Sequence, residues 1–444
     1  MTTILEILTF AWLVYWAWMA VKLLSRGANH PILYVFLVHL LYCGAPLLLN
    51  LLFGRPEYPS LPGINEALDD FPTHMLYCLY VGLCPMVWWK MSHLSSWRPL
   101  AKGGGGTPPV LNSTHVFACL TMLLLPFLYL LKVPDPAMYL HYTPGSRELY
   151  GRELEAFYHV VMAHLTLGSI LGGIFLLMHA RRFFYSLLFI APFLLGACWL
   201  NGKRHVVALL VGMIVFLAVD RGYWRGHRFI QRAILSAFAL LCFLAVYQYK
   251  LRLGDQSVAQ RTVQEWYENL RLDLGRDHTI KFSLFCELYS QPGRILDYRG
   301  QSLMIYLTAP IPRYFWPEKP ASYPYRLTSL AMQMPLQATG GALTTSILDE
   351  AISNFWLLGL FIGPWMISWV CQVAEKSHNK YMQAFSVFIV FFMQSTHLLA
   401  IYPFAVAWIV LGIRFHVFPS YEFSAGMRPS RSRCRSPVQN RRTL

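Results

Sequence analysis

The chain has 444 residues, 56% of them hydrophobic and only 13% charged, with a formal net charge of +15. This composition argues against a set of soluble domains. The positive charge does not indicate nucleic-acid binding, because the basic residues gather at the ends of apolar segments and in a C-terminal tail. Apolar stretches of about 17–25 residues, the length that crosses a bilayer as a helix, recur along the chain. We therefore predict an all-α polytopic membrane protein.

About eleven segments have the length and hydropathy of membrane-spanning helices. They are 3–24, 31–53, 74–89, 114–132, 156–180, 183–200, 205–219, 233–250, 355–374, 383–399 and 402–418. This division predicts a first bundle of eight spans over 1–250, a long loop over 251–354, three further spans over 355–418, and a basic, disordered tail over 419–444.

Lys and Arg residues cluster on alternate connections between these segments, which predicts that those connections are cytoplasmic. The N-terminus then lies outside and the C-terminus inside, as an odd number of spans also requires. The remaining loops share the outer face: 54–73, 133–155, 201–204, 251–354 and 400–402.

The long outer loop contains three candidate helices. Apolar residues at helical spacing from Val263 to Leu274 predict an amphipathic helix on the bilayer surface, with Leu270 on its apolar face and Arg271 among its polar positions. A second helix is expected from His278 to Tyr289, apolar on one face, and a third over 344–354, leading into the ninth span. Irregular backbone near a membrane is tolerated where it lines a wet cavity, so we expect the loop to cap a cavity.

The polar stretch from Tyr306 to Pro320 contains four prolines, which prevent a helix from running through it. Between the prolines stand Arg313 and Lys319, together with Tyr314 and Trp316. Two cations and two aromatic rings on a stiff segment suit an anionic or sugar-bearing ligand. The alternative is an ordered surface loop that the prolines only shape.

Two other places on the outer face carry candidate residues. Lys203 and Arg204 occupy a tight turn on the face where basic residues are disfavoured, so a binding role stands beside snorkelling at the interface as an alternative. Asp349 and Glu350 stand before the ninth span, where a carboxylate is either a general base or a cap on a helix N-terminus.

Weaker candidates in the outer loops are Arg276, His278 and Arg299, which are also suited to structural ion pairs. His278 and Glu350 remain alternative bases. No spacing of Cys or His residues indicates a metal site, and we expect metal-independent chemistry without a cofactor.

The segment Ile311-Pro-Arg-Tyr-Phe-Trp-Pro-Glu-Lys-Pro320, together with the acidic pair and the glycines of Gly359–Gly363, resembles the Wzy-type oligosaccharide repeat-unit polymerases of bacterial surface polysaccharides. Such proteins carry Pro-Arg-x-x-Trp-Pro-x-Lys-Pro late in the chain, followed by an acidic residue at the start of a Gly-containing span. Their outward-facing arginine after a mid-chain helix matches Arg204. The motif around Asn354 departs from the family pattern, in which an aromatic residue and a glycine flank the Asn-Phe pair.

The resemblance implies a membrane glycosyltransferase of GT-C-like architecture in the bacterial inner membrane, with a periplasmic active site. It would transfer a growing glycan from undecaprenyl diphosphate to the non-reducing-end hydroxyl of a new lipid-linked repeat unit. The residues assigned to catalysis are Glu350 and Arg313, and those assigned to the substrate are Lys203, Arg204, Arg276, His278, Arg299, Tyr314, Trp316 and Lys319. Membrane lipid, a chain-length regulator and a flippase are the implied partners, without nucleic acid.

Three alternatives remain open. An O-antigen ligase would use the same lipid-linked donor with a lipid A core acceptor. A transporter would place ionisable residues and broken helices at the membrane midplane. A scaffold protein would leave the outer cations without a role.

Overall fold

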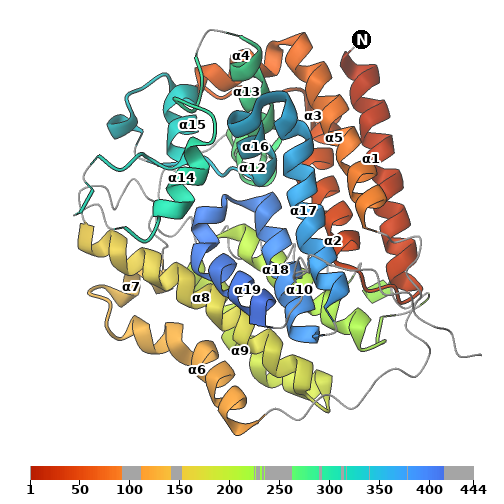
Figure 1. Ribbon diagram of the computed structural model, residues 1–444, viewed down its shortest axis with the longest axis vertical. Coiled ribbons are helices and arrows are strands. Elements are labelled where there is room, and N and C mark those ends of the chain that lie inside the picture. Colours follow the sequence, from red (N-terminus) through yellow and green to blue (C-terminus); the bar gives the residue numbers. More distant parts are fainter. Residues whose placement is uncertain are drawn as a thin grey trace, which may run out of the picture.

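The computed structural model describes residues 2–92, 112–141, 153–224, 226, 231–232, 235, 263–289, 293–311, 315–316, 318–339, 341–377 and 379–414. Within these ranges every regular element is helical (Figure 1), which confirms the predicted all-α class. The expected span at 233–250, apart from Leu235, and the expected tail at 419–444 lie outside the described residues.

The first helices of the chain form one side of a bundle in which α1, α3, α5 and α17 run side by side (Figure 1). They are α1 (Thr2–Ser25), α2 (Pro31–His39), a π-helix η1 (Leu40–Gly44), α3 (Ala45–Phe53) and α5 (Phe71–Met91). Pro31 stands at the first position of α2, where the missing backbone N–H costs no hydrogen bond.

The other side of the bundle consists of helices from the middle and the end of the chain. They are α6 (Ser113–Leu130), α7 (Pro136–His141), α8 (Glu153–His179), α9 (Phe183–Asn201), α10 (Arg204–Asp220), α17 (Gly359–Lys376), α18 (Lys380–Ser395), η6 (Leu398–Ile401) and α19 (Tyr402–Arg414).

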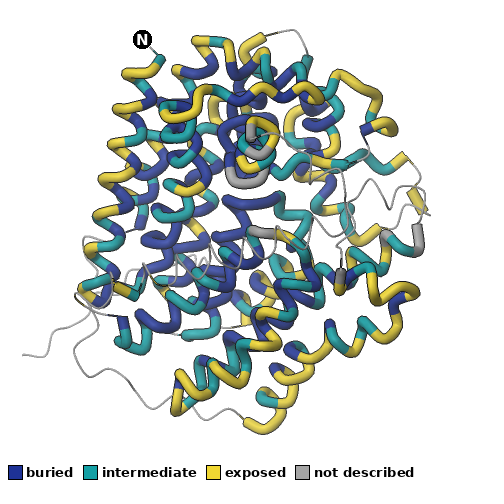
Figure 2. The backbone as a smooth tube through the Cα atoms, turned by 180° about the vertical axis from the view of Figure 1, so that it is seen from behind, coloured by how far each residue is buried: buried dark blue, intermediate teal, exposed yellow. Residues whose placement is uncertain are grey.

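The outer surfaces of several helices are apolar. Figure 2 shows the buried residues concentrated inside the bundle, whereas α6 and α9 carry exposed Phe117 and Phe189, 72% and 75% accessible. Large exposed apolar surface on a helix is typical of contact with lipid.

Six helical segments of the described chain are long and apolar enough to cross a membrane. They are Thr2–Ser25, Pro31–Phe53, Ser113–Leu130, Phe157–His179, Phe183–Asn201 and Ile347–Lys376. Together with the exposed apolar surface, they indicate a membrane-embedded helical protein. The total of about eleven spans stays a prediction.

A group of short helices, here called the cap, covers one end of the bundle (Figure 1). It comprises α4 (Pro62–Asp69), α12 (Val263–Leu274), α13 (Asp277–Leu288), α14 (Gln301–Thr308), α15 (Tyr323–Met332), η4 (Leu336–Ala338) and α16 (Ile347–Phe355). Ile64 of α4, Phe282 of α13 and Leu327 of α15 share a hydrophobic core separate from that of the bundle. The predicted outer loops 54–73 and 251–354 therefore fold together on one face.

Two details of the cap differ from the sequence prediction. On α12, Leu270 is 40% exposed, whereas Arg271, a predicted polar position, is buried in the protein. On α13, His278 and Lys281 are buried along with the apolar residues, so this helix is surrounded on all sides rather than apolar on one face. Both differences arise because Arg271, His278 and Lys281 lie beside the buried carboxylate of Asp277. The spacing of hydrophobic residues in the sequence does not indicate such pairs.

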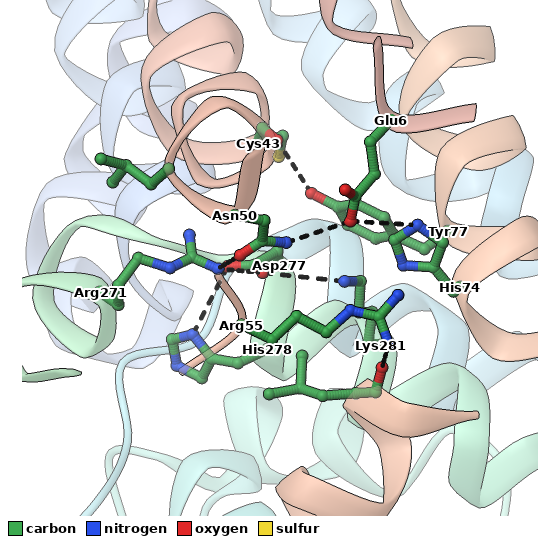
Figure 3. A network of polar contacts seen from close by, with 12 residues as sticks. Glu6, Cys43, Asn50, Arg55, His74, Tyr77, Arg271, Asp277, His278 and Lys281 are labelled. Carbon is green, nitrogen blue, oxygen red and sulfur yellow. Dashed lines mark hydrogen bonds and ion pairs between the residues drawn. The ribbon is translucent and has the colours of Figure 1, made fainter. Parts of the chain in front are cut away.

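The cap is joined to the bundle through a buried cluster of charged side chains, here called the junction (Figure 3). Arg271 Nη2 donates to Asp277 Oδ2 at 2.8 Å, and Lys281 Nζ lies 3.9 Å from the same oxygen. Arg271 also donates to Asn50 Oδ1 at 2.9 Å, and Asn50 Nδ2 in turn donates to Glu6 Oε1 at 3.2 Å. Desolvation raises the pKa of Asp277, but the charges of Arg271 and Lys281 outweigh it and leave that pKa below its ordinary value.

The turn between α12 and α13 inserts into the bundle beside this cluster. The backbone N–H of Arg276 donates to Tyr42 O at 2.9 Å, within the π-helix, and its guanidinium lies 4.9 Å from the centre of the Tyr42 ring. Arg276 Nη2 donates to Ser395 O at the end of α18, at 2.7 Å. A π-helix widens the helical turn and offers carbonyls that a regular α-helix would use internally. One turn therefore holds α12, α13, the π-helix and α18 together.

We expect Gly275→Ala to destabilise the protein by about 1–3 kcal/mol, because a Cβ at this position would lie 2.6 Å from Asp277 Oδ1 and 2.7 Å from Arg271 O. Thermal unfolding of purified protein in detergent measures the effect. Gly212→Ala, where a Cβ meets nothing within 4 Å, is the matched control and should leave the transition unchanged or raise it. A Gly275→Ala protein as stable as the control would contradict the close packing of this turn.

Removing the charge of Asp277 should lower the free energy of unfolding more than Gly275→Ala does. Asp277→Asn leaves Arg271 and Lys281 buried without their shared counter-ion, and we expect a loss of about 3–5 kcal/mol in the same unfolding assay. Asp69→Asn is the control, because the Asp69 side chain is 82% exposed and should contribute almost nothing. Equal unfolding temperatures for the two variants would show that the junction does not stabilise the attachment of the cap to the bundle.

Candidate functional site

The two adjacent carboxylates at the start of α16 have different environments. Asp349 accepts a hydrogen bond from the backbone N–H of Ser346 at 2.6 Å and another from the Ser346 hydroxyl, which closes a capping box at the helix N-terminus. Glu350 is one residue further along the helix and lines a pocket. The helix-cap alternative therefore applies to Asp349, and Glu350 remains the candidate base.

Helix α16 does not lead straight into the following span. The chain turns sharply at Trp356–Leu358, where Trp356 has φ 52°, and α17 packs back against α16. A Cβ on Gly359 would lie 2.1 Å from Ala351 O, so only glycine allows this approach. The fold-back carries Glu350 into the protein between the cap and the bundle.

The pocket lies between α14, α15, α16 and the connection from α18 to α19. Its polar lining residues are Ser302, Tyr306, Ser322, Tyr323, Glu350 and His397. The Tyr306 hydroxyl donates to Glu350 and lies 2.6 Å from Oε1 and 2.5 Å from Oε2. Glu350 is 1% exposed, whereas Tyr306 is half-buried and separates it from the surface. Burial and the Glu350 carboxylate raise the pKa of Tyr306, which therefore remains a proton donor.

Asn354 connects the pocket helices. Its side-chain N–H groups donate to Ser302 Oγ on α14 at 2.6 Å and to Glu350 O, one turn back on α16, at 2.8 Å. This residue, whose surrounding motif departs from the family pattern, thus orients the helix that carries Tyr306 toward the helix that carries Glu350.

Lys203 stands at the N-cap of α10, outside the pocket lining. His397, in the connection between α18 and η6, lines the pocket, and a neutral imidazole there is able to donate or accept a hydrogen bond. Lys203 itself is exposed, and α10 begins at Arg204, whose side chain falls outside the described residues.

One residue of the proline-rich stretch, Lys319, binds the C-terminal end of α14, a helix that lines the pocket. Lys319 Nζ donates to the carbonyls of Thr308, Ala309 and Ile311 at 2.9, 3.1 and 3.0 Å. These carbonyls lie at the C-terminal end of α14, where a cation satisfies unpaired acceptors. Trp316 is 36% exposed. Arg313 and Tyr314 lie outside the described residues.

The remaining candidates lie away from the pocket lining. Arg276 and His278 are in the junction, each 1% exposed. Arg299 pairs with Glu287 at 2.5 Å and donates to Ser353 O on α16 at 3.2 Å. In this conformation the three side chains hold the cap rather than face the pocket.

Two lining residues, Tyr306 and His397, were not selected from the sequence. Tyr306 follows Ser302 by four residues, so helical spacing alone would have placed both on one face. A lone histidine in an apolar segment, such as His397, does not reveal from the sequence which pocket it lines.

The pocket has the composition of an acid–base site, with a buried carboxylate, a hydroxyl donor and a neutral imidazole. Among the described residues, no group of three or more His, Cys, Asp or Glu side chains is placed to hold a metal ion. Comparisons of the chain with protein-family models, curated proteins and solved structures found no match. The arrangement suits removal of a proton from a hydroxyl group by Glu350.

Burial lowers the pKa of His278 to about 3, despite the opposing charge of Asp277. An unfolded chain binds this proton below about pH 6.5 while the folded protein does not, so stability falls as the pH falls below that value. At pH 5.5 the cost is about 1.4 kcal/mol. We expect the loss of stability from pH 7.5 to 5.5, measured by denaturant unfolding in detergent, to be smaller in His278→Gln by about this amount. Equal losses would mean that His278 is accessible to protons in the folded state.

Proposed function

We propose that the protein is a membrane glycosyltransferase that polymerises undecaprenyl-diphosphate-linked oligosaccharide repeat units by block transfer. The observation that carries the proposal is the Tyr306–Glu350 pair, a hydroxyl already donating to a buried carboxylate in a pocket beneath the cap. A glycosyl acceptor presents the same group, a hydroxyl that must be oriented and deprotonated.

In the proposed reaction Glu350 takes the proton of the acceptor hydroxyl, and the acceptor oxygen forms a bond to the anomeric carbon of the donor glycan. The bond from that carbon to the diphosphate oxygen breaks, and the electron pair leaves with undecaprenyl diphosphate. A cation is suited to stabilise this leaving group, and Lys203 is a candidate from its position on the predicted outer face. Arg204 and Arg313 are further candidates from the motif resemblance.

The proposed setting is the periplasmic side of a bacterial inner membrane, with the N-terminus periplasmic and the C-terminus cytoplasmic. The lipid carrier would reach the site from the bilayer. A chain-length regulator and a flippase are proposed as partners of the pathway. An O-antigen ligase would use the same donor chemistry with a lipid A core acceptor, so the acceptor distinguishes these two activities.

A transporter is the second candidate function, and the junction favours it. Arg271, Asp277 and Lys281 are ionisable groups buried beside the π-helical turn between α2 and α3. Ionisable residues buried in a membrane protein often mark ion pathways, and π-helical turns often lie at functional sites. The Tyr306–Glu350 pair has no role in that alternative.

Purified protein should convert a lipid-diphosphate-linked oligosaccharide into a ladder spaced by one repeat unit on a gel. We expect Glu350→Gln to reduce the rate of elongation at least about a hundredfold, because it removes the base while keeping the side-chain shape. Glu318→Gln, at an exposed position, is the matched control and should give the wild-type ladder.

Three results would contradict the proposal in distinct ways. Transfer to lipid A core without a ladder would indicate a ligase. An unimpaired ladder from Glu350→Gln would remove Glu350 from the mechanism. No transfer to either acceptor, with solute uptake into proteoliposomes, would indicate transport.

A further inference from the structure

The position of the Tyr306 hydroxyl is defined by the Glu350 carboxylate. The hydroxyl donates to this carboxylate and lies 2.6 and 2.5 Å from its two oxygens. Both residues line the same pocket, together with His397 and Leu399. The hydroxyl is thus held against a buried proton acceptor inside the pocket.

An attacking hydroxyl in glycosyl transfer needs the same neighbour. A carboxylate must accept its proton and hold its oxygen in position for the attack. Tyr306 itself is a poor nucleophile at this point, because burial and the nearby Glu350 charge raise the pKa of Tyr306. Its hydroxyl therefore marks a reactive position without reacting.

The helix that carries Tyr306 is anchored near both of its ends. Ser302 is tied to α16 by Asn354, and Lys319 caps the carbonyls at the other end of α14. The outward face of α14 carries exposed apolar residues such as Leu307, 76% accessible. Because Tyr306 is half-buried and α14 is anchored, the tyrosine side chain is able to rotate toward the protein surface while the helix stays folded.

We propose that the Tyr306 hydroxyl occupies the position of the acceptor sugar hydroxyl, and that its side chain turns outward when the acceptor binds. Tyr306 is a positioning and specificity residue in this scheme, which rests on the proposed glycosyltransferase function. The acceptor must replace the tyrosine hydrogen bonds with its own, so the site admits a correctly placed sugar hydroxyl more readily than water. The transfer step is unchanged, with the acceptor proton passing to Glu350 and the diphosphate leaving.

Tyr306→Phe tests this exchange because it removes the competing hydroxyl and keeps the ring. We expect the KM for the acceptor to fall about tenfold, the usual effect of one hydrogen bond to a charged group, and hydrolysis of the donor to rise relative to elongation. Tyr325→Phe, an exposed tyrosine on α15 outside the pocket lining, is the matched control. A fall in kcat with an unchanged KM would overturn the proposal, because Tyr306 would then serve only to hold Glu350.

A second measurement does not depend on any activity. A water-soluble carbodiimide with a small amine should modify Glu350 slowly in the wild type and at least about tenfold faster in Tyr306→Ala, with the site read by mass spectrometry. The full-length protein in detergent is used, and Glu318 provides an internal exposed reference. Equal labelling of Glu350 in both proteins would show that the Tyr306 side chain does not shield Glu350 and would overturn the proposal.

The two measurements separate the inference from the function on which it rests. A protein that makes no polymer but shows the labelling difference would refute the polymerase and retain Tyr306 as the cover of Glu350. A protein that makes polymer but shows neither the KM change nor the labelling difference would refute only the role of Tyr306.

Discussion

The structure depends on a carboxylate buried between cations. Asp277 accepts from Arg271 and lies close to Lys281, at the point where the cap meets the bundle. Each of these charges would be very costly to bury alone, and their mutual attraction makes the burial tolerable. Because Arg271 belongs to α12 and Asp277 begins α13, the pair also holds the turn that inserts Arg276 beside Tyr42. The docking of the cap thus follows from one electrostatic requirement.

The candidate site follows from the docked cap and from a second constraint, the reversal between α16 and α17. Gly359 allows the two helices to approach closely, and this approach turns Glu350 away from the end of the span and into the pocket. Within the cap α14 packs against α16, and Tyr306 meets Glu350. A carboxylate at this depth is protected from water by a side chain 44 residues earlier in the chain.

The sequence and the structure agree where a local pattern determines the outcome. The apolar segments form helices, and a helix forms near 344–354 with Glu350 in its first turn, as acidic residues near a helix N-terminus prefer. They disagree on α12, where Arg271 rather than Leu270 faces inward. A prediction from hydrophobic periodicity assumes that charged residues face water. The prediction fails when a charged residue is buried with an oppositely charged partner on another helix.

By itself the sequence determined the helical membrane class and the position of most helices, because apolar length, prolines and charge act over a few neighbouring residues. Only the tertiary structure decided that Asp349 caps the helix while Glu350 faces a pocket, that Lys319 caps α14, and that Tyr306 and His397 line the site. These roles depend on contacts between residues far apart in the chain. Their geometry is set by the buried junction and by the close packing at Gly359, which no local pattern encodes.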